Sequence, residues 1–411
     1  MKRTKVFLSL FLMLFLVALP SLGQADTTLK YWLWLDDPTD TTVSELVDKF
    51  NSLHPEIRVV IENVPLKDYH DQLAIALSAG VGPDAARFKD WWLGEFREAD
   101  LLEPLSSYIG EWPAKDDVIP NLWNMGKIPG EEEIYMMPHQ FITFYLYYRK
   151  DWFTEAGLNS PATFEEFLTA AKTFTDPGNN RYGFGLRGGD GGQDQWLAFM
   201  VAGGARVVDE EGNIVINSPK AVDVNQWYID LYSKYKVVPP SAPTDAYAQV
   251  TGAFQAGITA MMAHHVGSSV LMVEKLGDKV GVCPIPAADP KNPATMITMS
   301  GNVVFSPSQA KEEAFKFISW LTEPEQMDKW SRSRNGQLPV LNSVARMDHY
   351  INNEFFRVSM EGADYAIGWP PLPGVGYVSS HVWQVNMQRA LLGEITSQEM
   401  LDEIARALEE R

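Results

Sequence analysis

The feature that most constrains the fold of this chain is a repeated alternation of short apolar segments with segments of helical periodicity. Residues 29–35, 57–61 and 85–88 are short and rich in apolar residues, which predicts buried strands. Between them, apolar residues recur at helical spacing over 43–53 and 69–80. Because strands that alternate with helices of this length form βαβ units, the N-terminal part of the chain predicts a parallel sheet.

The same alternation continues to the end of the chain. Strands are predicted at 142–148, 258–262, 280–285 and 303–305, and helices at 163–174, 310–320 and 396–408. Three helices are predicted to begin at a capping box, in which a Thr is followed three residues later by a Glu. The pairs are Thr42–Glu45, Thr163–Glu166 and Thr396–Glu399. With no long linker or repeat, two α/β lobes that share the chain discontinuously are expected.

The N-terminal segment has the pattern of a secretory signal peptide. Three basic residues precede an uncharged, apolar stretch over 6–19, which is too short to span a membrane. Small residues at Gly23 and Ala25 predict cleavage after Ala25. No Cys lies directly after the apolar stretch, so we expect a free exported protein and not a lipoprotein. The 411 residues less these 25 leave 386, enough for two domains.

Charge and cysteine content restrict the partners and the compartment. The net charge of the full chain is −19, and removal of the basic N-terminal segment makes it −22. Such an acidic chain argues against nucleic acid or an anionic membrane as a partner. Cys283, the one cysteine, lies in an apolar strand-like run and is expected to be buried. An exported chain without an internal disulfide must be stabilised by its core.

Sequence motifs for cofactor, metal and nucleophile chemistry give no support for an enzyme. Residues 183–188 match G-x-G-x-x-G, but a loop precedes them and no helix opens within them, so a dinucleotide site is not expected. His264 and His265 are the one His pair, and neighbours on a strand are expected to diverge. No zinc-protease, nucleophile-elbow, Walker A or C-x-x-C pattern occurs. We expect no metal, no cofactor and no catalytic residues.

Aromatic residues gather where strands or turns are expected to end. The chain contains 13 Trp, 15 Tyr and 20 Phe. Trp34 precedes Asp36, Trp91 follows Lys89 and Asp90, Trp196 follows a Gly-rich turn beside Asp194, and Trp369 lies in a Pro-rich stretch. Ligands of open α/β sheets bind outside the carboxyl ends of strands. Aromatic faces beside charged hydrogen-bonding groups suit a sugar, whose C–H faces stack on rings.

The adjacent tryptophans at 91 and 92 are expected to have different roles. On a helix, Trp92 shares a face with Phe96, whereas Trp91 shares a polar face with Glu95. We therefore expect Trp92 in a core, whereas the periodicity gives no packing role to Trp91.

Several stretches in order resemble a known family. They are LVDKFNSLHPEIRVVIENVP (46–65), GVGPDAARF followed by ADLLEPL, FYLYYRKDWFTEAGLNSPATFEEFLTAAKTFT (144–175), FQAGITAMM (254–262), NGQLPVLNSV (335–344) and the C-terminal RALLGEITSQEMLDEIARALEE. Together they resemble the extracellular solute-binding proteins of ABC importers, family 1, the group that includes maltose-binding protein. The resemblance covers nearly the whole chain after the signal peptide.

The resemblance implies the type II periplasmic binding protein fold, with two Rossmann-like lobes joined by a hinge that the chain crosses three times. The N-terminal lobe would comprise 26–138 plus 298–340, and the C-terminal lobe 139–297 plus 341–411, with the first crossing near His139. The family is not enzymatic. Its members capture a solute, usually a sugar or oligosaccharide, and deliver it to a membrane permease.

The resemblance also implies a set of ligand contacts. Matched to the family, they fall on Trp34, Asp36, Lys89, Asp90, Trp91, His139, Asp194, Trp196 and Trp369. The chain departs from the family after Met262, where relatives often carry Asn-Gly-Pro-Trp and this chain has His264-His265-Val266-Gly267. Either the imidazole of His264 replaces a stacking Trp with a hydrogen bond, or the subsite is wider.

The expected function is therefore that of a periplasmic, monomeric, sugar-binding component of an ABC importer. Two alternatives stay open from the residues. Asp36, Asp37, Asp90 and Asp194 with aromatic neighbours could bind a cationic solute such as a polyamine, although Lys89 in the same group argues against it. A secreted glycosidase would need two carboxylates about 5–9 Å apart.

Overall fold

A computed structural model of the chain describes residues 27–35 and 37–410. The signal peptide with Ala25, and Asp36 of the predicted site, lie outside the described residues. Ten strands are described: β1 (Thr27–Leu33), β2 (Ile57–Asn63), β3 (Ala85–Lys89), β4 (Met137–Arg149), β5 (Tyr182–Gly185), β6 (Thr259–His265), β7 (Val280–Cys283), β8 (Thr295–Val304), β9 (Leu338–Pro339) and β10 (Ala366–Ile367). They form a mixed sheet with the order β2-β1-β3-β8-β4-β6-β5.

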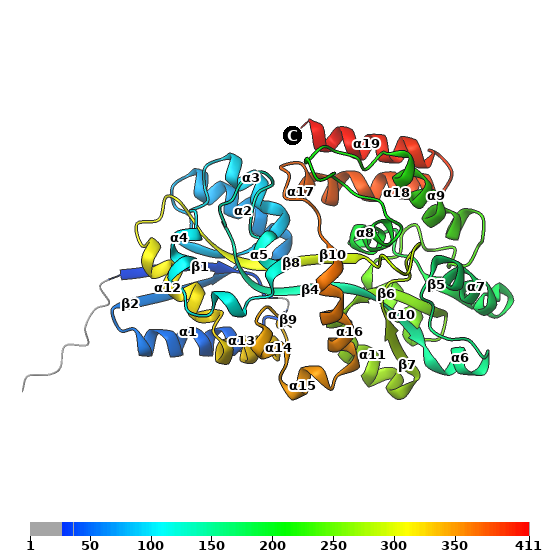
Figure 1. The fold of residues 1–411 in the computed structure, drawn as a ribbon, viewed down its shortest axis with the longest axis horizontal. Coiled ribbons are helices and arrows are strands. Elements are labelled where there is room, and N and C mark those ends of the chain that lie inside the picture. Colours follow the sequence, from blue (N-terminus) through cyan, green and yellow to red (C-terminus); the bar gives the residue numbers. More distant parts are fainter. Residues whose placement is uncertain (1–26, 36, 411) are drawn as a thin grey trace, which may run out of the picture.

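The molecule has two halves joined by long strands (Figure 1). The first half holds β1 to β3 and the helices α1 (Thr42–Leu53), α2 (Leu66–Ser78), α3 (Leu93–Glu98), α4 (Ser106–Glu111), α5 (Pro120–Asn124), α12 (Lys311–Leu321) and α13 (Pro324–Ser331). The second holds β5 to β7 with α6 (Lys150–Glu155), α7 (Phe164–Phe174), α8 (Gly192–Ala202), α9 (Pro219–Ser233), α10 (Tyr247–Gln255), α11 (Ser269–Leu276), α18 (Trp383–Leu391) and α19 (Ser397–Glu409). Near the junction lie α14 (Asn342–Ala345), α15 (Asp348–Ile351), α16 (Glu354–Gly362) and α17 (Val375–Tyr377).

The predicted parallel sheet is right for the first three strands and wrong for the middle of the sheet. Strand β1 pairs in parallel with β2 and with β3. The pairs β3–β8, β4–β8 and β4–β6 are antiparallel. The mixed directions arise because β4 enters the second half and β8 returns from it, so that the two strands run in opposite directions side by side.

Strands β4 and β8 are much longer than their apolar runs predict. Predicted as 142–148, β4 covers Met137–Arg149, and predicted as 303–305, β8 covers Thr295–Val304. The first part of β4 pairs with β8, and from Phe144 onward it pairs with β6. Both strands therefore extend through the junction of the two halves, and the predicted crossing at His139 lies within β4. The residue boundaries predicted for the lobes stay a prediction.

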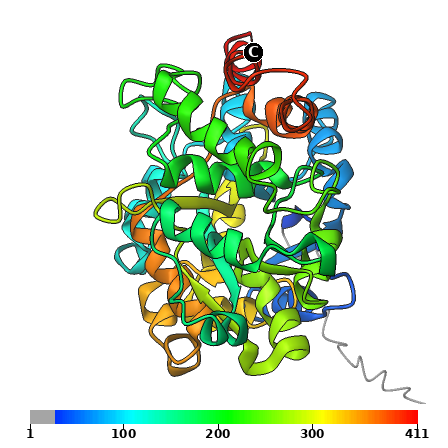
Figure 2. The ribbon, with the colours of Figure 1, turned by 90° about the vertical axis from the view of Figure 1, so that its right-hand side faces the viewer.

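Side chains alternate across β4 and bury two faces. Tyr145 and Tyr147 pack with Phe254 of α10, whereas Phe144 and Leu146 belong to the cluster that contains Phe184 and the residues of α7 and α8. From the end of the molecule (Figure 2), helices lie on either side of these strands. The strand is thus apolar on both faces, as expected for a strand covered by helices on each side.

Two of the three predicted capping boxes and the predicted burial of Cys283 are confirmed by the structure. The capping boxes of Thr163–Glu166 and Thr396–Glu399 are confirmed. The predicted box at Thr42 is wrong, because α1 begins at Thr42 itself and Thr41 occupies the N-cap, with its hydroxyl donating to Glu45 Oε1 at 2.8 Å. Cys283 is buried, as predicted. Within the described part of the chain, no helix combines the length and apolar character needed to cross a membrane.

Candidate functional site

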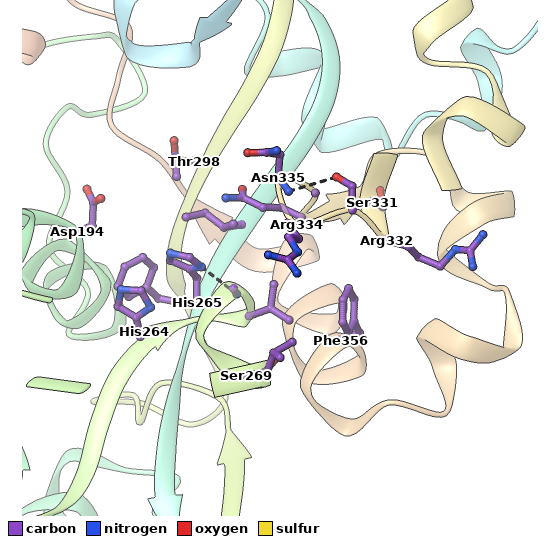
Figure 3. A pocket seen from close by; sticks show the side chains of 18 of the residues that line it. Asp194, His264, His265, Ser269, Thr298, Ser331, Arg332, Arg334, Asn335 and Phe356 are labelled. Atoms are coloured by element: carbon purple, nitrogen blue, oxygen red, sulfur yellow. Dashed lines mark hydrogen bonds between the residues drawn. The ribbon is translucent and has the colours of Figure 1, made fainter. Parts of the chain in front are cut away.

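A cavity of about 1040 Å³ lies between the two halves. Its lining comes from the end of β3, the loop after α13, the start of α8 and the end of β6. The polar and aromatic lining residues are Arg87, Lys89, Trp91, Phe144, Arg187, Asp194, Tyr247, His264, His265, Ser269, Thr298, Ser331, Arg332, Ser333, Arg334, Asn335, Gln337, His349, Tyr350 and Phe356. In Figure 3, Asp194 and the two histidines lie on one side of the cavity and Asn335, Arg334 and Arg332 on the other.

The end of β3 supplies Lys89 and Trp91 to the lining. The Lys89 ammonium lies 5.1 Å from the ring centroid of Trp34 and 5.2 Å from that of Trp91. A short 3-10 helix over Asp90–Trp92 follows β3 directly, so consecutive side chains point in different directions. As a result, Trp91 lines the cavity, while Trp92 is buried against Trp34.

Asp90 lies behind this wall and is 3% exposed. Its Oδ1 accepts a hydrogen bond of 3.1 Å from the hydroxyl of Thr298, which itself lines the cavity. Burial raises the pKa of Asp90 to about 7, despite hydrogen bonds and the Lys89 charge that favour the carboxylate. Asp90 therefore supports the cavity wall through Thr298 and does not itself line the cavity.

The loop before α8 brings Arg187, Gly191 and Asp194 to the cavity. Gly191 has φ of 75°, a left-handed conformation that favours glycine, and a Cβ there would lie 2.0 Å from a terminal nitrogen of Arg187. Burial raises the pKa of Asp194 to about 6, an effect that the charges of Lys89 and Arg187 oppose. Asp194 occupies the first turn of α8, where a negative charge is favourable.

The prediction that the two histidines diverge is wrong. The rings of His264 and His265 lie 4.2 Å apart, because β6 ends at His265 and the chain turns there into a short 3-10 helix. His264 Nδ1 lies 2.8 Å from the hydroxyl of Ser268. His265 Nδ1 accepts a hydrogen bond from the Gly267 amide, so its proton is on Nε2. Burial lowers the pKa of His265 to about 3, so this imidazole is neutral at pH 7.

The structure brings four of the predicted site residues to the cavity, namely Lys89, Trp91, Asp194 and His264. The others that are described are buried and are not among the residues that line it. Trp34 is 1% exposed under the guanidinium of Arg87, and His139 packs on Trp330. Trp196 is fully buried in α8, with its indole N–H donating to Asn225 at 2.8 Å, and it packs against Trp369, which is also buried. Ligand contact by any of them stays a prediction.

Sequence reasoning missed several residues that line the cavity. Arg187 lines the cavity and lies within the G-x-G-x-x-G stretch. In the sequence, this stretch suggests only a nucleotide motif. Tyr247 begins α10 and follows a Pro-rich loop without a clear periodic signal. Asn335 lies in the NGQLPV stretch, which contributes to the family resemblance but not to the ligand contacts that the resemblance implies. Its amide group is held by Asp37 and Asp40, so the loop after α13 is fixed to the segment after β1.

Comparison with known proteins identifies a family and several relatives that this chain resembles. Residues 36–328 match the family model described as bacterial extracellular solute-binding protein. A putative binding protein of Brucella abortus is 27% identical over 336 residues, 80% of each chain. The maltotriose-binding protein of Pyrococcus abyssi is 24% identical over 342 residues, 81% of this chain and 71% of that protein.

A solved structure extends the likeness to the whole fold. The crystal structure of an ABC transporter solute-binding protein of Thermotoga lettingae, bound with alpha-D-tagatose, superposes with a TM-score of 0.79 at 28% identity. The match covers 93% of this chain and 99% of that one. The expected fold, two α/β lobes of the type II periplasmic binding protein class, is confirmed. The family model matches more than half of the length of this chain. The chain therefore belongs to the bacterial extracellular solute-binding protein family.

Proposed function

We propose that the protein is the extracytoplasmic binding component of an ABC importer and that it captures a carbohydrate in the cavity between its two halves. The observation that carries this proposal is that both halves line one cavity, to which the first half contributes Trp91 and Lys89 and the second half Asp194 and His264. A ligand that contacts both walls stabilises the closed arrangement of the halves.

Size and surface chemistry favour a saccharide. The volume of about 1040 Å³ is at the upper end of small-molecule sites, enough for more than one sugar ring. The half-buried ring of Trp91 offers a face for stacking, and Asn335, Thr298 and Asp194 offer donors and acceptors for hydroxyl groups. The Thermotoga lettingae structure contains a sugar, and the Pyrococcus abyssi relative is named for one.

The lining argues against the two alternative functions. A polyamine would meet Arg187 and Lys89, and like charges in a partly buried site repel a cationic ligand. A glycosidase needs two carboxylates at the ligand, and among the described lining residues Asp194 is the one carboxylate. We therefore propose a binding protein and not an enzyme.

The remaining assignments rest on the family and on the N-terminal sequence. We propose that the signal peptide is cleaved after Ala25, that the protein is not lipidated, and that it acts as a monomer. In the closed form it would deliver its solute to the membrane subunits of the importer.

A thermal-shift screen of the purified protein tests the proposal. The panel contains mono-, di- and oligosaccharides, polyols, sugar acids and polyamines. A ligand at 100 times its dissociation constant adds about 2.7 kcal/mol to the free energy of unfolding, which raises the melting temperature by a few degrees. A saccharide hit that is weakened by Trp91→Ala and unaffected by Trp152→Ala, a half-buried Trp outside the cavity, supports the proposal. A hit confined to polyamines overturns it.

A further inference from the structure

A second hollow adjoins the cavity between the halves. This hollow, the outer groove, has a volume of about 550 Å³. Its lining comes from α11, from α15 and α16, and from the two asparagines that join α15 to α16 (Figure 1). None of its residues is among the ligand contacts that the family resemblance implies, so the groove has no assigned role.

Four residues, Ser269, Val270, His349 and Phe356, line both the cavity and the outer groove. The first two belong to α11 and the other two to α15 and α16, so they border the place where the two hollows meet from both sides. In the view of Figure 3, Ser269 and Phe356 lie at the same end of the cavity. A ligand that fills the cavity can therefore extend past these residues into the groove.

Apolar side chains continue from the cavity into the outer groove. Tyr350 lines the cavity, and its ring centroid lies 5.3 Å from that of Phe356, which lines both hollows. Phe355 follows in the groove, and on α11 the side chains of Val270 and Val273 are 65% and 42% exposed. Ring faces and exposed aliphatic groups in a hollow next to a ligand site match the C–H faces of a sugar chain.

Polar groups of the outer groove can serve the hydroxyl groups of such a chain. The Oδ1 of Asn353 accepts a hydrogen bond of 3.0 Å from the first turn of α16, which leaves its Nδ2 without a partner among the described residues. Glu354 pairs with Lys150 at 3.0 Å, and Glu274 is exposed to water. The groove thus combines an amide donor and carboxylate acceptors with its apolar side chains.

The walls of the outer groove are attached to different halves of the molecule. Helix α11 belongs to the second half. Helix α15 is held to α13 of the first half, where Asp328 Oδ1 lies 2.8 Å from His349 Nε2 and accepts a hydrogen bond of 3.2 Å from the Tyr350 hydroxyl. A ligand in the groove would therefore contact both sides of the junction, as a ligand in the cavity does.

We propose that the outer groove is a subsite and that the solute is an oligosaccharide, one end of which lies against Trp91 in the cavity while the other passes Phe356 into the groove. This inference rests on the proposed function and specifies its substrate class. A monosaccharide or an acyclic polyol would leave the groove empty and its two valines in water. Further rings of a chain cover these valines, which is favourable.

Calorimetric titration with ligands of graded length tests the inference. Malto-, cello-, xylo- and arabino-oligosaccharides, each from the monosaccharide to the heptasaccharide, are compared with mannitol and erythritol. In the series that binds, we expect the affinity to rise by roughly tenfold or more between the disaccharide and the longest chain. The rise should end at the chain length that fills both hollows.

Variants of the outer groove locate the added rings. Val273→Arg places a longer side chain in the groove, at a position that does not line the cavity. It should weaken binding of the longest chains by roughly tenfold and leave binding of mono- and disaccharides unchanged. Phe355→Leu removes a ring and keeps an apolar side chain, and should have a smaller effect of the same kind. Val385→Arg, at a 55% exposed position of α18 outside both hollows, is the matched control and should bind every chain as the parent does.

The outcomes that overturn the inference can be told apart from failure of the proposed function. An affinity that rises no further beyond the disaccharide, binding confined to polyols, or equal affinities of Val273→Arg and Val385→Arg for the longest chains refutes the outer subsite. Each of these leaves the capture of a solute in the cavity intact. Absence of binding to every saccharide and polyol refutes the proposed function together with the inference.

Discussion

Trp91 and Trp92 are consecutive residues with opposite environments. Trp92 is 7% exposed, and its ring centroid lies 5.4 Å from that of Phe88 and 5.9 Å from those of Trp34 and Tyr69. Trp91 lines the cavity and packs against the cores of both halves. One tryptophan thus fixes the end of β3 in the first half, and the other presents its ring between the halves.

Alanine substitutions should separate these two environments. Trp92→Ala deletes a buried aromatic side chain and should lower the free energy of unfolding by roughly 3–5 kcal/mol. Trp91→Ala should change the unfolding free energy little and weaken saccharide binding roughly tenfold or more. Urea unfolding and calorimetric titration of both variants measure the two effects. The assignment of roles fails if the binding defect belongs to Trp92 and the stability defect to Trp91.

Acid should weaken the attachment of the loop after α13 to the segment after β1. Partial burial alone would raise the pKa of Asp40, but hydrogen bonds from Thr42 and Asn335 outweigh it and lower the pKa to about 2. A lowered folded-state pKa means that Asp40 stabilises the fold above about pH 4, and that this contribution is lost as pH falls toward 2.

Asp40→Asn tests that attachment. The variant should lose about 1–2 kcal/mol of unfolding free energy at pH 7, and its stability should fall less steeply between about pH 4 and 2 than that of the parent. Asp48→Asn, an exposed carboxylate on α1, is the control and should match the parent. Identical acid unfolding curves for all three proteins would contradict the prediction.

Asp90 should have the opposite pH dependence. Burial raises its pKa, so the folded protein holds a proton that the unfolded chain releases. The contribution of Asp90 to stability should therefore decline as pH rises from about 4 to 7. Asp90→Asn removes the ionisation, keeps an acceptor for Thr298, and should be more stable relative to the parent at pH 8 than at pH 5. Asp223→Asn, on the exposed side of α9, should show no such trend, and a parallel trend in the two variants would refute this account.

Gly183 should be required for packing and not for a cofactor. A Cβ at Gly183 would lie 2.2 Å from the carbonyl oxygen of Ala171, because β5 lies directly against α7. Gly183→Ala should cost about 1–3 kcal/mol or more. Gly252→Ala, in the exposed face of α10 with open space around it, should gain roughly 0.5–1 kcal/mol. Thermal unfolding compares the two variants, and a neutral Gly183→Ala would show that the close approach does not matter.

The fold was predictable where local signals and packing agree. The apolar runs of β1, β2 and β3 and the capping boxes of Thr163 and Thr396 predicted elements that the structure contains. The lengths of β4 and β8 were not predictable, because buried polar residues interrupt their apolar pattern. Gln140 accepts a hydrogen bond from the indole of Trp330, and Asn302 accepts one of 2.6 Å from Tyr31. In a sequence, a polar residue inside a strand looks like the end of that strand when its hydrogen-bond partner is distant along the chain.

The site was predictable in part for a related reason. The helical periodicity around Trp91 distinguishes an apolar face from a polar one, and the structure places Trp91 in the cavity lining. Around Trp196 the helix is buried on nearly all sides, so no periodic signal shows which residues face a ligand. Arg187 was missed because its position depends on the turn at Gly191, whose backbone angles are not apparent from composition.

The paired strands β4 and β8 restrict how the two halves can move. Side by side, they pair along Met137–Thr143, with a register shift between Pro138 and Gln140, and form a two-stranded ribbon at the junction. Such a ribbon bends easily out of its own plane, where only backbone torsions change by small amounts, but it resists sideways bending, which would stretch one strand against the other. Gly301 keeps the ribbon tight, since a Cβ there would lie 2.4 Å from the carbonyl oxygen of Met137. We therefore expect closure of the halves to follow the easy bending direction of this ribbon and to bring the same pairs of side chains opposite each other each time.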